Sequence, residues 1–255
     1  MKGIAIDVPD QNHMKNQYFG DINDFKKYGL LRILSSGGLR TAVCWMLTDA
    51  DSGNDGKFIE YLREPQKWRA YNAALFDSLV RCVHDTGIRT VKWAHQPGFL
   101  PSTVFYDALL TDKIDARQQY FERFLEMAQG NDLVFFDPDN GLEVRSTAVG
   151  RKGSSKYVYW DELTRTFTAG YSILMYQHFP RIDHKVYLKR LAEDAGRRTG
   201  MREIISFSTA NVVFLLIPQP RHLERLQERS AQVRTAWGTQ IEVTRHVYPS
   251  PVSSM

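Results

Sequence analysis

Apolar residues follow two alternating patterns along the 255-residue chain. Short apolar runs indicate buried strands over 41–47, 132–136, 172–176, 204–208 and 212–217, with weaker candidates at 88–94 and 103–109. Apolar residues at helical spacing indicate helices over 24–34, 69–84, 115–129, 160–167, 183–197 and 223–237, and a last strand is expected over 240–247. Strands separated by helices predict an α/β fold with a mostly parallel, Rossmann-like sheet that carries helices on both faces.

The runs 204–208 and 212–217 are separated by a short polar break, which predicts a hairpin and an antiparallel strand near one edge of the sheet. No internal repeat and no low-complexity linker divides the chain. We therefore expect one domain over 18–248, with an N-terminal extension over 1–17 and a flexible tail over 249–255.

Composition places the chain among globular proteins, with 43% hydrophobic and 24% charged residues and a formal net charge of +4. No apolar run reaches the ~18 residues that a membrane span needs, and the N-terminal residues lack the apolar core of a signal peptide. Cys44 and Cys82 lie inside apolar stretches, which predicts buried, inert thiols and suits a reducing compartment. The cytoplasm is the expected location.

Polar residues follow three of the expected strands, and ligands of open parallel sheets bind outside the carboxyl ends of the strands. Asp49, Asp51 and Asp55 follow the first strand, in a loop with Gly53 and Gly56. Asp137 and Asp139 follow the 132–136 strand, and Gln177 and His178 follow the 172–176 strand. If these groups share one rim, five carboxylates there imply a bound cation, hydrogen bonds or a shared proton.

Each of these segments also has a structural interpretation. The loop over 49–56 matches neither an EF-hand nor a Walker loop, so it is either an ordinary polar loop or a turn that holds ribose hydroxyls. The turn Asp137-Pro138-Asp139-Asn140-Gly141 places an acceptor beside a rigid proline, although Asn-Gly turns are also common for steric reasons. His178 is a candidate general base or metal ligand, or simply hydrogen bonded. The chain lacks the spacing of a structural zinc site and of a hydrolase nucleophile elbow.

Basic residues gather in two places. Arg145, Arg151, Lys152 and Lys156 fall in one segment that contains Gly and Ser, and Arg221, Arg225, Arg229 and Arg234 fall in the last helix. They form either solvated faces or surfaces that follow the phosphates of a nucleic acid.

The order of motifs resembles that of the large-ribosomal-subunit RNA adenine-N6 methyltransferases. That family opens with His-Ala-Gly-Asn-x-Ala-Asp-Val-x-Lys-His, and this chain matches the pattern at Gly20, Asp24 and Lys27. The family's catalytic Asp-Pro-Pro-Tyr corresponds to Asp137-Pro138-Asp139-Asn140, and its Trp-Tyr-Pro strand end to Gln177-His178-Phe179-Pro180. A late Asn-Pro-Pro turn corresponds to Pro218-Gln219-Pro220.

The resemblance implies a methyltransferase-type sheet, S-adenosylmethionine as cofactor and an RNA or DNA substrate. It implies cofactor-binding roles for Tyr18, Gly20, Asp24, Lys27, Asp49, Asp51 and Gly53, and catalytic roles for Asp137, Pro138, Asp139, Asn140 and His178. Asn140 replaces the tyrosine that would stack on a flipped base, and Asp139 replaces the second proline. Tyr157, Tyr159 and Trp160 are candidates for a substitute stacking surface, or else pack in the core.

Two other functions stay open at this point. A Mg²⁺- or Mn²⁺-dependent nuclease or phosphohydrolase would use Asp49, Asp51, Asp137 and Asp139 as metal ligands, with His178 as base. A catalytically inactive module would bind RNA, DNA or a protein. Both enzymatic interpretations require the segments 24–27, 49–55 and 137–140 to meet in one crevice.

Overall fold

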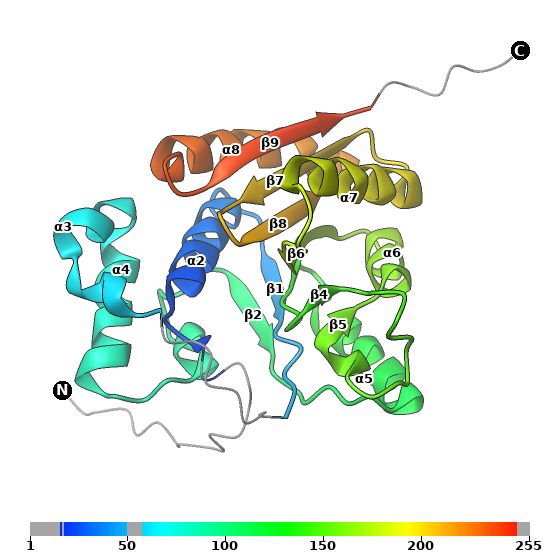
Figure 1. The fold of residues 1–255 in the computed structure, drawn as a ribbon, viewed down its shortest axis with the longest axis horizontal. Helices are drawn as coiled ribbons and strands as arrows, with labels where there is room; N and C mark the ends of the chain where they lie inside the picture. Colours follow the sequence, from blue (N-terminus) through cyan, green and yellow to red (C-terminus); the bar gives the residue numbers. More distant parts are fainter. Residues whose placement is uncertain (1–15, 17, 50–57, 249–255) are drawn as a thin grey trace, which may run out of the picture.

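The computed structural model describes residues 16, 18–49 and 58–248 (Figure 1). A seven-stranded sheet in the order β2-β1-β3-β6-β8-β7-β9 forms its centre. The strands are β1 Thr41–Cys44, β2 Thr103–Tyr106, β3 Leu133–Phe136, β6 Ser172–His178, β7 Glu203–Ser208, β8 Val212–Ile217 and β9 Glu242–Val247. Neighbours among β2, β1, β3 and β6 are parallel, and those among β6, β8, β7 and β9 are antiparallel.

This topology confirms the predicted α/β fold and the hairpin, which is β7–β8. The antiparallel strand β8 lies between β6 and β7, and β9 forms the edge. The buried strands alternate their apolar side chains between two clusters, because successive side chains of a strand point to opposite faces. In β3, for example, Leu133 and Phe135 belong to one cluster while Val134 and Phe136 belong to the other.

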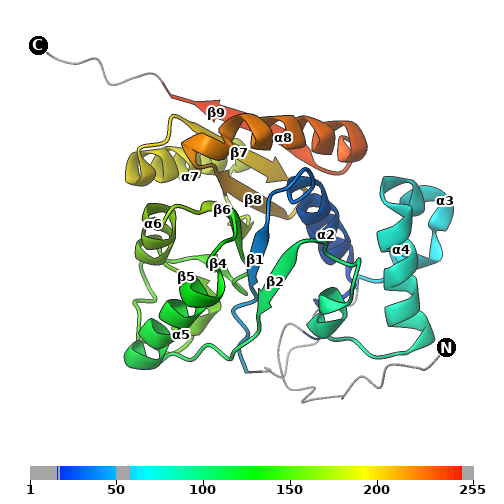
Figure 2. The ribbon, with the colours of Figure 1, turned by 180° about the vertical axis from the view of Figure 1, so that it is seen from behind.

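Helices cover both faces of the sheet, as Figures 1 and 2 show from opposite sides. α2 (Ile22–Leu34), α4 (Ala73–Val80) and α8 (Leu223–Trp237) contribute to the first cluster. α5 (Ile114–Met127), α6 (Trp160–Thr168) and α7 (His184–Thr199) contribute to the second. A separate two-stranded sheet joins β4 (Gly141–Leu142) to β5 (Tyr157–Val158). No helix in the described part of the chain is long and apolar enough to cross a membrane.

Residues 60–95, between β1 and β2, form a helical insertion in which one predicted strand is absent and one predicted helix begins later than expected. It contains 3₁₀ turns at Glu60–Arg63 and Arg69–Tyr71, α3 (Pro65–Trp68), α4, a π-helical turn at Arg81–Asp85 and a 3₁₀ turn at Val91–His95. The helix predicted over 69–84 begins only at Ala73, because the Asn72 side chain caps it by accepting from the Leu75 N–H.

The strand predicted over 88–94 does not form. The Thr90 hydroxyl accepts from the Lys92 N–H, and the Trp93 indole N–H donates to the carbonyl of Ile88. These local bonds occupy backbone groups that a sheet ladder would need. Asn16, which sequence analysis places in the N-terminal extension, is buried, and its side chain accepts from the Val91 N–H.

The strand order reverses between β1 and β3. The chain runs from β1 to β2 on one side and later places β3 on the other side of β1. Such a switch point opens a crevice at the carboxyl ends of the two strands. Cys44 and Phe136 are paired at these ends, so Trp45 and Asp137 leave the sheet side by side.

Candidate functional site

A buried lysine joins the start of α2 to the end of β3 at this switch point. The Lys27 ammonium lies 2.6 Å from Oδ1 of Asp24 and 3.0 Å from Oδ2 of Asp137. Lys27 is 6% exposed, Asp24 is 4% exposed and Asp137 is 1% exposed. Lys27 and Asp137 are 110 residues apart in the sequence. Of the three segments expected to meet, 24–27 and 137–140 are therefore in contact, while residues 50–55 of the third lie outside the described residues.

Local structure fixes Asp24 at the first turn of α2. Asp21 caps the helix by accepting from the N–H groups of Asn23 and Asp24. The second carboxylate oxygen of Asp24 accepts from the Gly20 N–H at 3.1 Å and from the Tyr28 hydroxyl at 3.2 Å. Gly20 has a φ of +81°, and a Cβ there would lie 2.5 Å from a methyl group of Val83. Its observed role is to shape this turn.

Aromatic rings surround the ammonium of Lys27. It lies 5.2 Å from the ring centroid of Tyr28, 5.5 Å from Trp45 and 6.0 Å from Tyr176. Tyr18 is half-buried. Because aromatic faces attract cations, these rings add to the two carboxylates in holding the lysine charged.

Burial and charge shift the pKa values of this cluster. Burial lowers the pKa of Lys27, but the charges of Asp137 and Asp24 outweigh it and raise the pKa above its ordinary value. Burial, followed by the charge of Asp24, raises the pKa of Asp21 to about 7. The carboxylates of Asp24 and Asp137 both contact the one ammonium of Lys27.

Hydrogen bonds anchor the turn after β3 at Asp137, Asp139 and Asn140. The Asp137 N–H donates to the carbonyl of Cys44 at 3.1 Å, and the Thr48 hydroxyl donates to the Asp139 carboxylate at 2.5 Å. The Asn140 N–H donates to the carbonyl of Lys156 at 2.8 Å. Pro138 is buried, Asp139 is partly buried and Asn140 is exposed. The turn thus runs from the buried Asp137 to the exposed Asn140.

Gln177 and His178 belong to β6, which runs two residues further than predicted. The Gln177 side-chain oxygen accepts from the Leu142 N–H at 2.6 Å, which ties β4 to β6. A Cβ on Gly141, whose φ is +93°, would lie 2.3 Å from that oxygen. His178 is exposed and packs edge-on against Tyr176, with ring centroids 5.0 Å apart. Gln177 therefore supports the turn, and His178 lies at its rim.

Of the three aspartates that follow β1, the structure describes only Asp49. Asp49 is exposed, and Asp51, Gly53 and Asp55 lie outside the described residues. Within 16, 18–49 and 58–248, no three His, Cys, Asp or Glu side chains are arranged to hold a metal ion. The ammonium of Lys27 already neutralises Asp137, a proposed ligand of the metal-dependent interpretation.

No family model matches this chain, and no curated protein matches it. Among solved structures, the chain is similar to protein LPL1258 from Legionella pneumophila, whose crystal structure carries the family-model name DUF519. The two chains are 8% identical, and the match covers 92% of this chain and 98% of that chain with a TM-score of 0.42. A likeness of this size establishes neither the fold nor an activity.

Sequence reasoning missed Asp107, which directly follows β2 and is exposed. The Trp45 indole N–H donates to Nε2 of His95, which stacks on Phe105 with a centroid distance of 4.2 Å. Burial lowers the pKa of His95, and the charge of Asp107 acts on it in the opposite direction. An acid after the second strand is a signal for ribose binding in dinucleotide folds. The strand predicted over 103–109 hid that signal by including Asp107.

The aromatic residues proposed as a stacking surface pack in the core instead. Tyr159 and Trp160 are buried, and Tyr157 is partly buried. The Tyr159 hydroxyl donates to the carbonyl of Thr147, and the Arg198 guanidinium lies over the Trp160 ring at 5.1 Å. The packing interpretation of Tyr159 and Trp160 therefore holds.

The two basic groups differ in their contacts. Arg145, Arg151 and Lys152 are exposed, whereas Lys156 is partly buried. In the last helix segment, three arginines are tied to the protein itself: Arg221 donates to the carbonyl of Gly170, Arg229 to Gln232 and Arg234 to the carbonyl of Val243. The segment at 145–152 is therefore the better phosphate-binding candidate.

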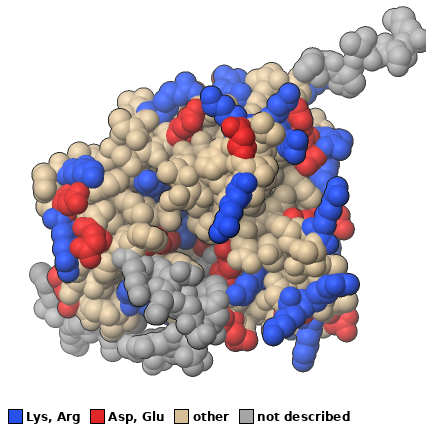
Figure 3. Space-filling model, in the orientation of Figure 1, with Lys and Arg blue, Asp and Glu red and all other residues tan. Residues whose placement is uncertain are grey.

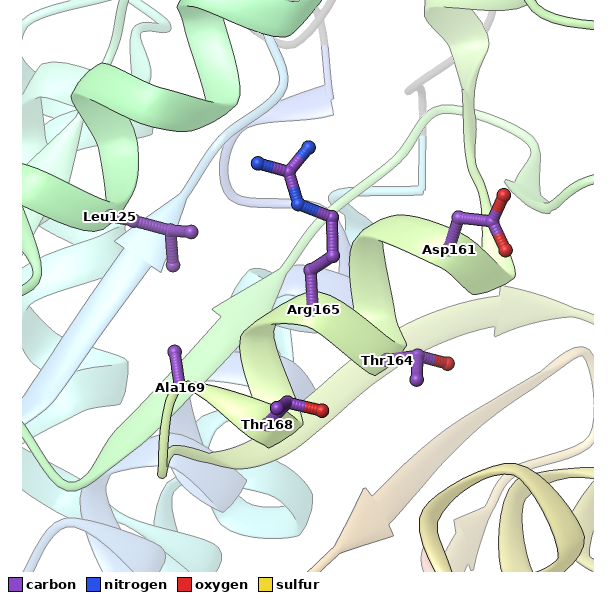
Figure 4. A pocket seen from close by; sticks show the side chains of 6 residues that line it. All are labelled: Leu125, Asp161, Thr164, Arg165, Thr168 and Ala169. Atoms are coloured by element: carbon purple, nitrogen blue, oxygen red, sulfur yellow. The ribbon is translucent and has the colours of Figure 1, made fainter.

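An open groove of about 650 Å³ lies between α5 and α6 (Figure 4). Leu125, Asp161, Thr164, Arg165, Thr168 and Ala169 line it. None of these residues belongs to the Lys27 cluster or to the turn after β3. The geometry of strand ends and buried charges, rather than this groove, therefore defines the candidate site.

Proposed function

We propose that this protein is an S-adenosylmethionine-dependent methyltransferase that methylates an amino group of a nucleic acid. The Lys27–Asp137 ion pair at the β1/β3 switch point is the observation that carries the proposal. It unites two of the four motifs on which the methyltransferase resemblance rests, and it does so where open α/β sheets bind ligands.

The crevice suits a cofactor that carries an adenosine and a positive charge. The Asp24 and Asp137 carboxylates, which both contact Lys27, would attract a sulfonium cation. Asp107, exposed directly after β2, would accept hydrogen bonds from ribose hydroxyls. The cofactor would supply an activated methyl group.

The chain's own residues would orient the target nitrogen. The Asp137 carboxylate and the Pro138 carbonyl would accept the N–H groups of the amine, which directs its lone pair toward the methyl donor. Lys27 would hold the Asp137 carboxylate in a fixed direction, because its ammonium contacts Oδ2 directly. Asn140, exposed at the same turn, would contact the target base by hydrogen bonding instead of by stacking.

Isothermal titration calorimetry with S-adenosylmethionine and with S-adenosylhomocysteine tests the proposal. We expect both to bind, and Asp107→Asn to weaken binding by about tenfold, which corresponds to about 1.4 kcal/mol. Asp77→Asn, which alters an exposed ion pair with Arg69, is the matched control and should bind as the wild type does. Folded wild-type protein that binds neither compound would remove the proposal.

The inactive-module alternative makes a different forecast. Its supporting observation is the exposed Asn140 in place of an aromatic residue. A module of that kind would bind nucleic acid without transferring a labelled methyl group from S-adenosylmethionine to RNA or DNA. Transfer that disappears in Asp137→Ala, with the variant still folded, would instead identify the enzyme.

A further inference from the structure

Residues 143–153 form an exposed segment directly after the turn at 137–140, which we term the basic segment. Arg145, Arg151 and Lys152 are exposed on it, and its acid, Glu143, faces inward and accepts from the Trp160 N–H at 2.9 Å. Figure 3 shows Lys and Arg side chains gathered over the region where Figure 1 places α5 and β5. The exposed charge of the segment is thus positive.

The carboxyl end of the basic segment is clamped by a buried arginine. Arg117 of α5 is 2% exposed and donates to the carbonyls of Ser154 at 3.1 Å and Tyr157 at 2.7 Å. The same guanidinium binds both carboxylate oxygens of Glu162, at 2.6 and 2.9 Å. A planar guanidinium can satisfy four acceptors in fixed directions, which a lysine cannot.

Asp112 adds a second clamp beside the first. Its carboxylate accepts from the N–H groups of Gly153 at 2.8 Å and Ser155 at 2.7 Å, and from the Ser154 hydroxyl at 3.3 Å. Arg151 and Lys152 immediately precede this clamp. Their backbone is therefore held while their charged ends face the solvent.

The other parts of the basic segment are also tied down. The Glu143 N–H donates to the carbonyl of Val158 at 2.8 Å, and the Tyr159 hydroxyl donates to the carbonyl of Thr147 at 2.9 Å. Gly150 packs against Ile114, since a Cβ on Gly150 would lie 2.7 Å from Cγ1 of that residue. A segment ordered before binding loses less conformational entropy when a ligand binds.

We propose that the basic segment is a preformed surface for nucleic-acid phosphates, and that Arg117 and Asp112 are positioning residues for it. The inference rests on the proposed function, because it identifies the partner of the same site as a nucleic acid. The Asn140 N–H contacts the carbonyl of Lys156, so the surface adjoins the turn that would hold the target base. Exposed Val144, Val149 and Ile114 supply apolar contact for sugars or bases beside the charges.

Fluorescence anisotropy with a labelled 20-nucleotide single-stranded RNA, measured over a range of salt concentrations, tests the charges. Each phosphate contact contributes about 0.7 to the slope of log affinity against log salt. We expect Arg151→Gln/Lys152→Gln to lower the magnitude of the slope by about 1.4. The control Lys185→Gln/Arg190→Gln removes two exposed charges from α7 and should leave the slope unchanged. Equal slopes for the two double variants would overturn the proposal that the basic segment binds phosphates.

Asp112→Asn and Arg117→Lys test the positioning role, because both leave Arg145, Arg151 and Lys152 in place. We expect about 3- to 10-fold weaker RNA binding with the wild-type salt slope, since the charges remain but must be ordered on binding. Wild-type affinity in both folded variants would overturn the positioning role. If Arg117→Lys fails to fold, Asp112→Asn alone decides.

S-adenosylmethionine titrations of the same proteins separate this inference from the proposed function. Cofactor binding by wild type without any RNA binding would overturn the surface and leave the enzyme proposal standing. RNA binding without cofactor binding would overturn the enzyme proposal and leave the phosphate-binding surface standing. Binding to anionic lipid vesicles or to an acidic peptide, but not to RNA, would also overturn the nucleic-acid assignment.

Discussion

The raised pKa of Asp21 predicts that removing its charge stabilises the protein at high pH. Asp21 is 5% exposed, and its pKa rises from 3.8 to about 7 because of burial and the charge of Asp24. The folded state therefore holds a proton that the unfolded state releases near pH 3.8. The stability linked to this proton is complete below that pH and is lost as the pH rises through about 7.

One pKa unit corresponds to about 1.4 kcal/mol, so the loss amounts to at most about 4 kcal/mol. The value is an upper bound because the amino end of α2 also favours a carboxylate at the cap. Asp21→Asn keeps the cap, since asparagine and aspartate are equally good N-cap residues. The variant should match the wild type at pH 4 and exceed its stability at pH 8.5 by as much as about 4 kcal/mol.

Urea denaturation at pH 4, 5.5, 7 and 8.5 measures this difference directly. Asp183→Asn is the matched control, because Asp183 caps α7 by accepting from the Val186 N–H and is exposed to solvent. Its effect should stay small and constant over the series. A difference between Asp21→Asn and wild type that does not grow with pH would refute the reasoning.

Two further substitutions test the packing of the site. Lys27→Met leaves Asp24 and Asp137 buried without their cation and should cost about 3–5 kcal/mol in urea denaturation. Lys67→Met, at an exposed pair with Glu64, should cost under about 1 kcal/mol, and equal losses would contradict the buried ion pair. Gly141→Ala should destabilise by at least 1 kcal/mol more than Gly200→Ala, because both glycines have positive φ but only Gly141 abuts Gln177. Similar melting temperatures for the two glycine variants would count against the close contact.

The sequence predicts the sheet well because its strands are nearly continuous apolar runs. Leu133–Phe136 and Val212–Ile217 are each recognisable alone. Strand-end logic accounts for Asp137 alone, because Lys27 lies in α2, and its place in the site was expected only from the resemblance in motif order. The prediction fails at 88–94, where the apolar pattern indicates a strand. Side-chain hydrogen bonds of Thr90 and Trp93 give this segment a different local structure.

The clamp around the basic segment is not predictable from the sequence. In the helix pattern, Arg117 is indistinguishable from a solvated surface residue, and its partner Glu162 lies 45 residues away. Only tertiary packing shows that this arginine is buried. Asp107, unlike Arg117, could have been identified from the sequence, because it directly follows a strand. The predicted strand ended three residues too late and therefore included it.

A crystal structure of the protein with S-adenosylhomocysteine tests the central claim most directly. The account predicts an adenosyl group between the carboxyl ends of β1 and β3, with its ribose at Asp107 and its sulfur beside the turn at Asp137. Ligand bound in the groove between α5 and α6, or at any site remote from the Lys27–Asp137 pair, would contradict it.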